Sequence, residues 1–103
     1  MDKPRTMTKE EVRELFLDSI RVLVDYWDKV ENVSQRDKID GVAFSILNII
    51  DGMSGDFPCP LTLVTEYSEE DKQYCIENGK NYVEDSMAIN DDVMLHEIYY
   101  KEE

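Results

Sequence analysis

The stretch GVAFSILNII, residues 41–50, carries no charge in a chain of 103 residues of which 34% are charged. Apolar residues in and around it recur at spacings of three and four, the period of one helical face: Ile39, Val42, Ala43, Ile46, Leu47, Ile50 and Met53. An uncharged helix is usually buried on most of its sides, so this stretch predicts the inner helix of the fold. Ser34, followed by Asp37, predicts its N-cap, and Gly52 predicts its end.

A second helix is predicted to precede it. Thr8-Lys9-Glu10-Glu11 has the form of a capping box, which places the helix start there. The predicted apolar face is Val12, Leu15, Phe16, Ile20, Leu23, Trp27 and Val30, and it is widened by Leu17, Val24 and Tyr26. Because only the short link 32–34 separates the two helices, we expect an antiparallel helical hairpin. Residues 1–7 are expected to form a flexible arm.

The second half of the chain predicts shorter elements. Residues 52–60 have the composition of a loop. The alternation in residues 61–67 predicts a strand, whose only internal partner would be 81–84; otherwise it pairs with another copy or another protein. Ser68 and the acids after it predict the start of a short helix that ends at 78–79. Asn90 predicts the cap of a last helix over 91–101.

These elements predict a single small acidic domain over residues 1–103, of the α+β class. It would consist of a helical hairpin of two long helices, a short strand region and two shorter helices. The alternative is an all-α domain, if residues 61–67 are merely extended.

Charge is unevenly distributed along the chain. Of the net charge of −13, residues 1–55 contribute −3 and residues 56–103 contribute −10. The acidic half disfavours nucleic acid and anionic membranes as partners and favours basic proteins, although acidity also serves solubility. No long apolar segment marks a secretory signal, and Cys59 and Cys75 form no metal or disulfide pattern. We therefore expect a cytoplasmic protein with reduced thiols and no cofactor.

The only histidine is the centre of one candidate constellation. Asp92, His96 and Tyr100 are spaced i, i+4, i+8, so on a helix they would lie near one line. A carboxylate beside an imidazole can orient it as a base, but a structural Asp–His pair that packs the last helix is the favoured interpretation. Asp51, Asp56, Asp91 and Asp92 could gather around a hard cation, but the spacing does not fit a calcium loop, and scattered solvated acids are the favoured interpretation.

Two possible nucleophiles are not favoured by their sequence context. Ser54 is not in a GxSxG motif and is interpreted as part of a turn. Cys59 has no Lys or Arg within ten residues on either side, so nothing nearby in sequence would activate its thiol.

Three short patches resemble a family of short bacterial proteins that has no assigned activity. They are GVAFSIL at 41–47, IDG at 50–52 and LHEIYY at 95–100. The resemblance implies a bacterial, cytoplasmic setting, and no functional residue carries over from it.

Three functional hypotheses remain open. The leading one is a non-enzymatic acidic binding protein, such as an immunity protein or antitoxin, that engages a basic partner. Its candidate binding residues are Glu69, Glu70, Asp71, Asp91, Asp92 and His96. The second is a small metal- or ligand-binding enzyme that uses Asp51, Asp56, Asp92 and His96. The third is a structural homodimer joined through the strand at 61–67.

Overall fold

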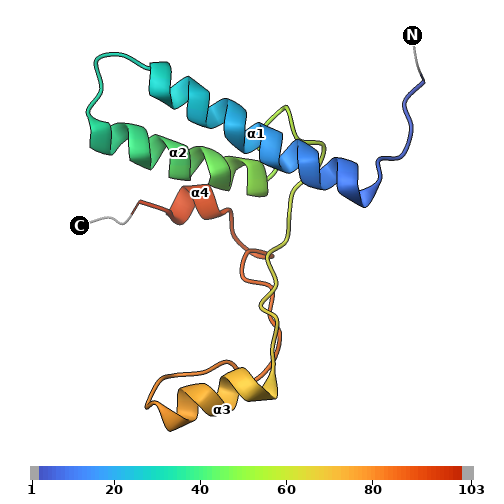
Figure 1. Ribbon diagram of the computed structural model, residues 1–103, viewed down its shortest axis with the longest axis vertical. Coiled ribbons are helices and arrows are strands. Elements are labelled where there is room, and N and C mark those ends of the chain that lie inside the picture. Colours follow the sequence, from blue (N-terminus) through green and yellow to red (C-terminus); the bar gives the residue numbers. More distant parts are fainter. Residues whose placement is uncertain (1–2, 101–103) are drawn as a thin grey trace. The chain divides into compact units, whose positions relative to one another are not determined.

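A computed structural model describes residues 3–100. It contains four helices within that range: α1 (Lys9–Lys29), α2 (Gln35–Ile50), α3 (Glu69–Glu77) and α4 (Leu95–Ile98) (Figure 1). The chain divides into two compact units. We call Met1–Leu61 with Leu95–Glu103 the helical unit, and Thr62–Met94 the inserted unit. No helix among the described residues has both the length and the apolar character needed to cross a membrane.

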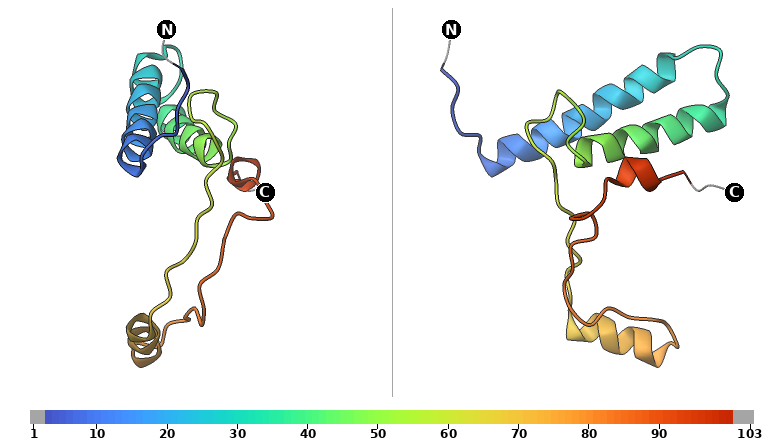
Figure 2. Two further views of the ribbon diagram at one scale, coloured as in Figure 1. Left: turned by 90° about the vertical axis from the view of Figure 1, so that its right-hand side faces the viewer. Right: turned by 180° about the vertical axis from the view of Figure 1, so that it is seen from behind.

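The helical unit is built on the hairpin of α1 and α2, which lie side by side in opposite directions in every view (Figure 2). The helix starts follow the sequence predictions. Thr8 and Glu11 form the predicted capping box, and the Ser34 hydroxyl accepts the N–H of Asp37. The predicted end of α2 is confirmed by Gly52, whose φ of +80° is one that a glycine adopts without strain.

Trp27 fixes the spacing of the two long helices. Its indole Nε1–H donates to the Ser45 hydroxyl at 2.9 Å. A Cβ placed on Gly41 would lie 2.5 Å from the Trp27 ring, so the helices approach this closely only because position 41 has no side chain. The predicted role of Trp27 in packing is therefore confirmed.

Burial in the helical unit is strongest at the end of α2. Ile49 and Ile50 are buried there, and Phe57 from the following loop is buried edge-on against Phe16. Ile49 is not part of the predicted apolar stripe of α2, yet it is the most buried hydrophobic residue within residues 3–100. The reason is that two other segments contact α2. One is α4, and the other is the segment at Leu61, whose N–H donates to Ile50 O.

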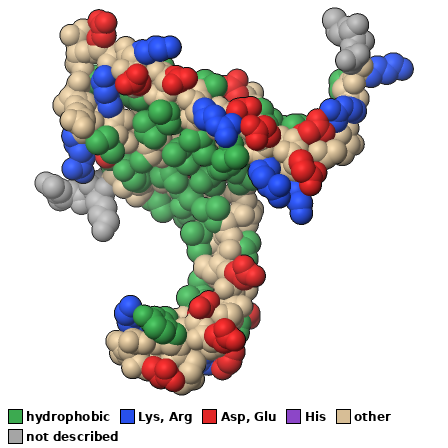
Figure 3. Space-filling view, viewed as in Figure 1, with side chains coloured by type: hydrophobic (Ala, Val, Ile, Leu, Met, Phe, Trp, Pro, Cys, Tyr) green, Lys and Arg blue, Asp and Glu red, His purple; other side chains and the backbone are tan. Residues whose placement is uncertain are grey.

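The predicted face of α1 is half-buried throughout, but the residues expected to widen it are not part of it. Leu17, Val24 and Tyr26 are exposed, because α2 is the only helix within residues 3–100 that packs on α1, and it leaves the flanks of α1 in water. Figure 3 shows hydrophobic side chains gathered over one face of the helical unit. Of the predicted arm, residues 3–7 are non-helical and Arg5 pairs with Glu11, while residues 1–2 lie outside the described range.

The predicted α+β class is wrong, because no strand forms among the described residues. Residues 61–67 make one isolated antiparallel bridge, between Val64 and Ala88. The partner segment is thus 86–90, not the predicted 81–84. Two backbone hydrogen bonds flank the bridge, Thr65 N to Met87 O and Ile89 N to Leu63 O, both at 2.9 Å.

In the rest of this pairing, side-chain oxygens accept the backbone N–H groups in place of backbone carbonyls. The N–H groups of Leu63, Tyr67 and Met87 donate to Asn90 Oδ1, Ser86 Oγ and Thr65 Oγ1, respectively. Ser, Thr and Asn side chains compete with backbone acceptors in this way, and a two-stranded ribbon is marginal in any case. The all-α alternative is therefore the one that the structure supports.

The predicted last helix over 91–101 is also wrong in extent. Residues 91–94 are irregular, α4 is a single turn, and residue 101 lies outside the described range. Asn90 does not cap α4, because its side-chain oxygen accepts the N–H of Leu63. By contrast, α3 (Glu69–Glu77) has the predicted Ser68 as its N-cap and Asn78 as its C-cap, followed by Gly79 with its φ of +67°.

Candidate functional site

His96 is paired with Asp51, not with Asp92. His96 Nδ1 lies 2.6 Å from Asp51 Oδ2. The same carboxylate accepts the N–H of Leu95 at 2.9 Å and the N–H of His96 at 2.7 Å. Asp51 therefore caps α4 and fixes the His96 ring at once. The line of Asp92, His96 and Tyr100 that a longer helix would have formed does not exist, because Asp92 is outside α4.

The environment of the pair is closed. The Asp51 side chain is only 1% exposed and that of His96 is 16% exposed. The Phe44 ring stands edge-on to the imidazole and is stacked with Tyr100, and the Tyr99 hydroxyl donates to Asp40. Three hydrogen bonds therefore hold Asp51, which has almost no contact with solvent. The pair joins α4 to the residue that follows α2.

Electrostatics at Asp51 reflect two opposing effects. Burial raises the pKa of its carboxyl group, while hydrogen bonds from the backbone and ring of His96 and from the Leu95 N–H lower it. The lowering effects prevail, so the pKa of Asp51 lies below its ordinary value and the group is ionised in the folded protein.

The other members of the proposed enzyme site come from other segments of the chain. Asp56 lies in the loop after α2, and its backbone N–H donates to the Ser54 hydroxyl. Asp92 belongs to the inserted unit. Within residues 3–100, no group of three or more His, Cys, Asp or Glu side chains is placed to hold a metal ion.

The remaining candidate residues are all exposed and all belong to the inserted unit. Glu69, Glu70 and Asp71 form the first turn of α3, where negative charge is favourable beside the helix N-terminus. Asp91 and Asp92 lie in the irregular segment near the end of the unit. Of the six predicted binding residues, only His96 lies in the helical unit.

The inserted unit holds nine Asp or Glu residues against two Lys. Both lysines are already engaged within the unit. Lys72 Nζ lies 3.5 Å from Glu84 Oε1 and 5.6 Å from the centre of the Tyr82 ring, and Lys80 Nζ lies 5.5 Å from the centre of the Tyr74 ring. Glu84 raises the pKa of Lys72, which is therefore a fixed positive charge. Among the described residues, Glu84 is the only carboxylate of this unit with a cationic partner.

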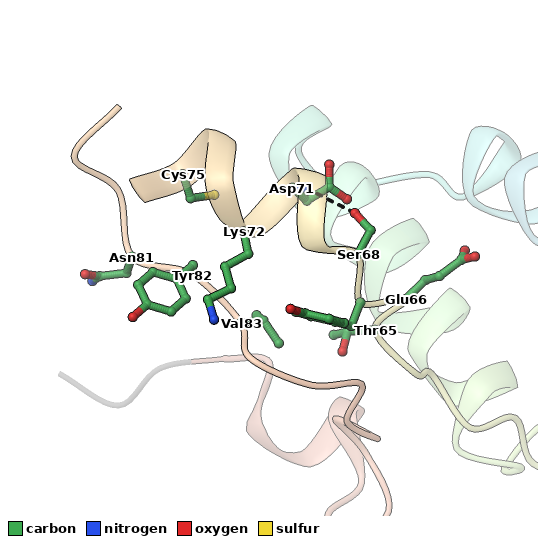
Figure 4. Close-up of a pocket in the computed structure, with 10 residues that line it drawn as sticks. Thr65, Glu66, Ser68, Asp71, Lys72, Cys75, Asn81, Tyr82 and Val83 are labelled. Carbon is green, nitrogen blue, oxygen red and sulfur yellow. Dashed lines mark hydrogen bonds between the residues drawn. The ribbon is translucent and has the colours of Figure 1, made fainter. Parts of the chain in front are cut away.

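A pocket of about 240 Å³ lies within the inserted unit, lined by residues of α3 and of the segments before and after it. Figure 4 shows Lys72 reaching from α3 toward Tyr82 and Val83. The Tyr67 hydroxyl, from a residue that lines the pocket, donates to Glu69, and this hydrogen bond raises the pKa of Tyr67. Sequence reasoning missed Lys72 and its aromatic neighbour, because nothing in their spacing of ten residues indicates a contact.

No family model, curated protein or solved structure matches this chain.

Proposed function

We propose that this chain is a non-enzymatic acidic binding protein, and that its inserted unit is the element that engages a basic protein. An immunity protein or antitoxin directed at a basic toxin belongs to this class. The proposal rests on one observation: the only two lysines of the inserted unit are engaged internally, and eight of its nine carboxylates have no cationic partner among the residues that the structure describes.

The burial pattern supports this assignment. No residue of the inserted unit is buried, so the unit has no core whose formation would explain its sequence. Its apolar side chains are instead exposed beside the acids, among them Leu63, Tyr74, Met87 and Ile89. A surface that combines unpaired charge with exposed apolar groups fits association, since charge accelerates encounter and apolar burial holds the complex.

Capture with matched charge variants tests the proposal. The tagged full-length chain is incubated with lysate of its source organism at low and at moderate salt, and captured proteins are identified by mass spectrometry. One variant neutralises five acids of the inserted unit: Glu69→Gln, Glu70→Gln, Asp71→Asn, Asp91→Asn and Asp92→Asn. The control neutralises five exposed acids of the helical unit: Glu10→Gln, Asp25→Asn, Asp28→Asn, Glu31→Gln and Glu97→Gln.

The proposal predicts a stoichiometric basic protein that the wild type and the control capture and that the first variant loses. Purified, that protein should associate with the first variant about tenfold more slowly than with the wild type, and moderate salt should weaken wild-type binding. Equal loss in both variants would show that net charge alone is responsible and would overturn the assignment to the inserted unit. Capture of no basic protein at either salt would overturn the proposal.

A further inference from the structure

One edge of the inserted unit has backbone N–H groups that find no partner within residues 3–100. In residues 63–67, alternate N–H groups point inward: those of Leu63, Thr65 and Tyr67 all donate across the pairing. The intervening N–H groups, of Val64 and Glu66, donate to no acceptor within the described chain. The bridge between Val64 and Ala88 agrees with this pattern. Because the backbone hydrogen bonds lie on either side of the bridge, the N–H and C=O of Val64 point away from Ala88.

The two faces of this ribbon differ in character. Leu63 pairs with Ile89 and Thr65 pairs with Met87, so these side chains share one face, and Leu63, Met87 and Ile89 are exposed on it. Val64 and Glu66 face the other way, and Val64 is 60% exposed. An added strand with alternating side chains would therefore meet an apolar face on one side and a face with a carboxylate on the other.

We infer that the edge at Val64–Glu66 accepts an extended segment of a basic protein, which pairs with it through backbone hydrogen bonds as an added strand would. The inference rests on the function proposed above and specifies its mode of binding: backbone hydrogen bonds to Val64, apolar side chains beside Leu63 and Ile89, and basic side chains beside Glu66. A second copy of this chain is disfavoured as the occupant, because it would place two units of net charge −7 edge to edge.

A backbone-specific test separates strand addition from charge attraction. The probe is a fluorescent peptide of alternating Lys and Val, about ten residues long, which matches both faces of the ribbon. Binding to the full-length chain is measured by fluorescence anisotropy. Val64→Pro removes the outward N–H and leaves the inward hydrogen bonds of the ribbon. Ala88→Pro removes the equivalent group on the opposite edge and serves as the matched control. Circular dichroism reports whether both variants keep their helices.

Two further peptides make the test independent of any change in the protein. One peptide is methylated at the backbone nitrogens of its valines and the other at those of its lysines. Each peptide therefore keeps its full charge but loses the N–H groups along one of its two edges. We expect Val64→Pro and one of the two methylated peptides to weaken binding about tenfold each, and Ala88→Pro to leave binding within about twofold.

Each alternative outcome has a distinct meaning. Salt-sensitive binding that neither Val64→Pro nor either methylated peptide weakens would overturn strand addition and leave the acidic binding function standing. No binding of any peptide even at low salt would overturn both. A dimer in sedimentation velocity that Val64→Pro abolishes would assign the edge to a second copy and overturn the basic partner as its occupant.

Discussion

The helical unit and the inserted unit differ in what holds them together. In the helical unit, Ile49, Ile50 and Phe57 are buried, and a buried carboxylate ties α4 to the end of α2. In the inserted unit no side chain is buried, and the structure rests on helix caps, a single bridge and exposed side-chain hydrogen bonds. Since burial of apolar surface is the dominant stabilising contribution, we expect the helical unit to be the more stable, and the proposed function would let the inserted unit gain burial from a partner.

The largest expected effect is at Asp51. Asp51→Ala removes the acceptor for two backbone N–H groups and the partner of His96, so we expect a loss of about 3 kcal/mol in the free energy of unfolding, measured by urea denaturation. Asp56→Ala, five residues away in an exposed loop, is the control and should change this free energy by less than about 0.5 kcal/mol. Equal effects of the two substitutions would mean that α4 does not stabilise the scaffold.

A smaller loss is expected where the two long helices touch. Gly41→Ala would place a methyl group 2.5 Å from the Trp27 ring, and the helices must separate to accept it. Overpacking of this kind costs about 2 kcal/mol. Gly55→Ala is the matched control, because no atom lies within 4 Å of its new Cβ, and it should be neutral within about 0.5 kcal/mol. A shift in Trp27 fluorescence should accompany the first substitution only.

The same cap substitution in the two units sharpens the comparison. Ser34 and Ser68 each accept a backbone N–H at the start of a helix, so Ser34→Ala and Ser68→Ala should each cost about 1 kcal/mol. Ser34→Ala should lower the global free energy of unfolding. Ser68→Ala should speed amide exchange in α3 and leave exchange in α1 and α2 unchanged. Parallel changes in both units would show that they unfold as one.

The smallest effect concerns pH. The pKa of Asp51 is lower in the folded chain than in the unfolded one, so its contribution is fully present above the unfolded pKa of about 4 and is lost as the pH falls through the folded value. The difference in unfolding free energy between the wild type and Asp51→Asn should therefore shrink below about pH 4. A difference that stays constant between pH 7 and pH 3 would contradict the lowered pKa.

The sequence by itself determined the local features of this protein. The caps at Thr8, Ser34 and Ser68 and the helix ends at Gly52 and Gly79 depend on residues a few positions apart, which a sequence displays directly. The acidic character of the second half is likewise a matter of composition. The strand failed as a prediction because Ser86, Asn90 and Thr65 supply side-chain acceptors that alternation does not reveal.

Only the tertiary structure decided which distant groups meet. Asp51 and His96 are 45 residues apart, and the sequence offered Asp92 as the nearer partner. Trp27 against Gly41, Val64 against Ala88 and Lys72 beside Tyr82 are contacts of the same kind. Their formation depends on the path of the whole chain, because the loss of chain entropy on closing long loops is repaid only when many contacts form together.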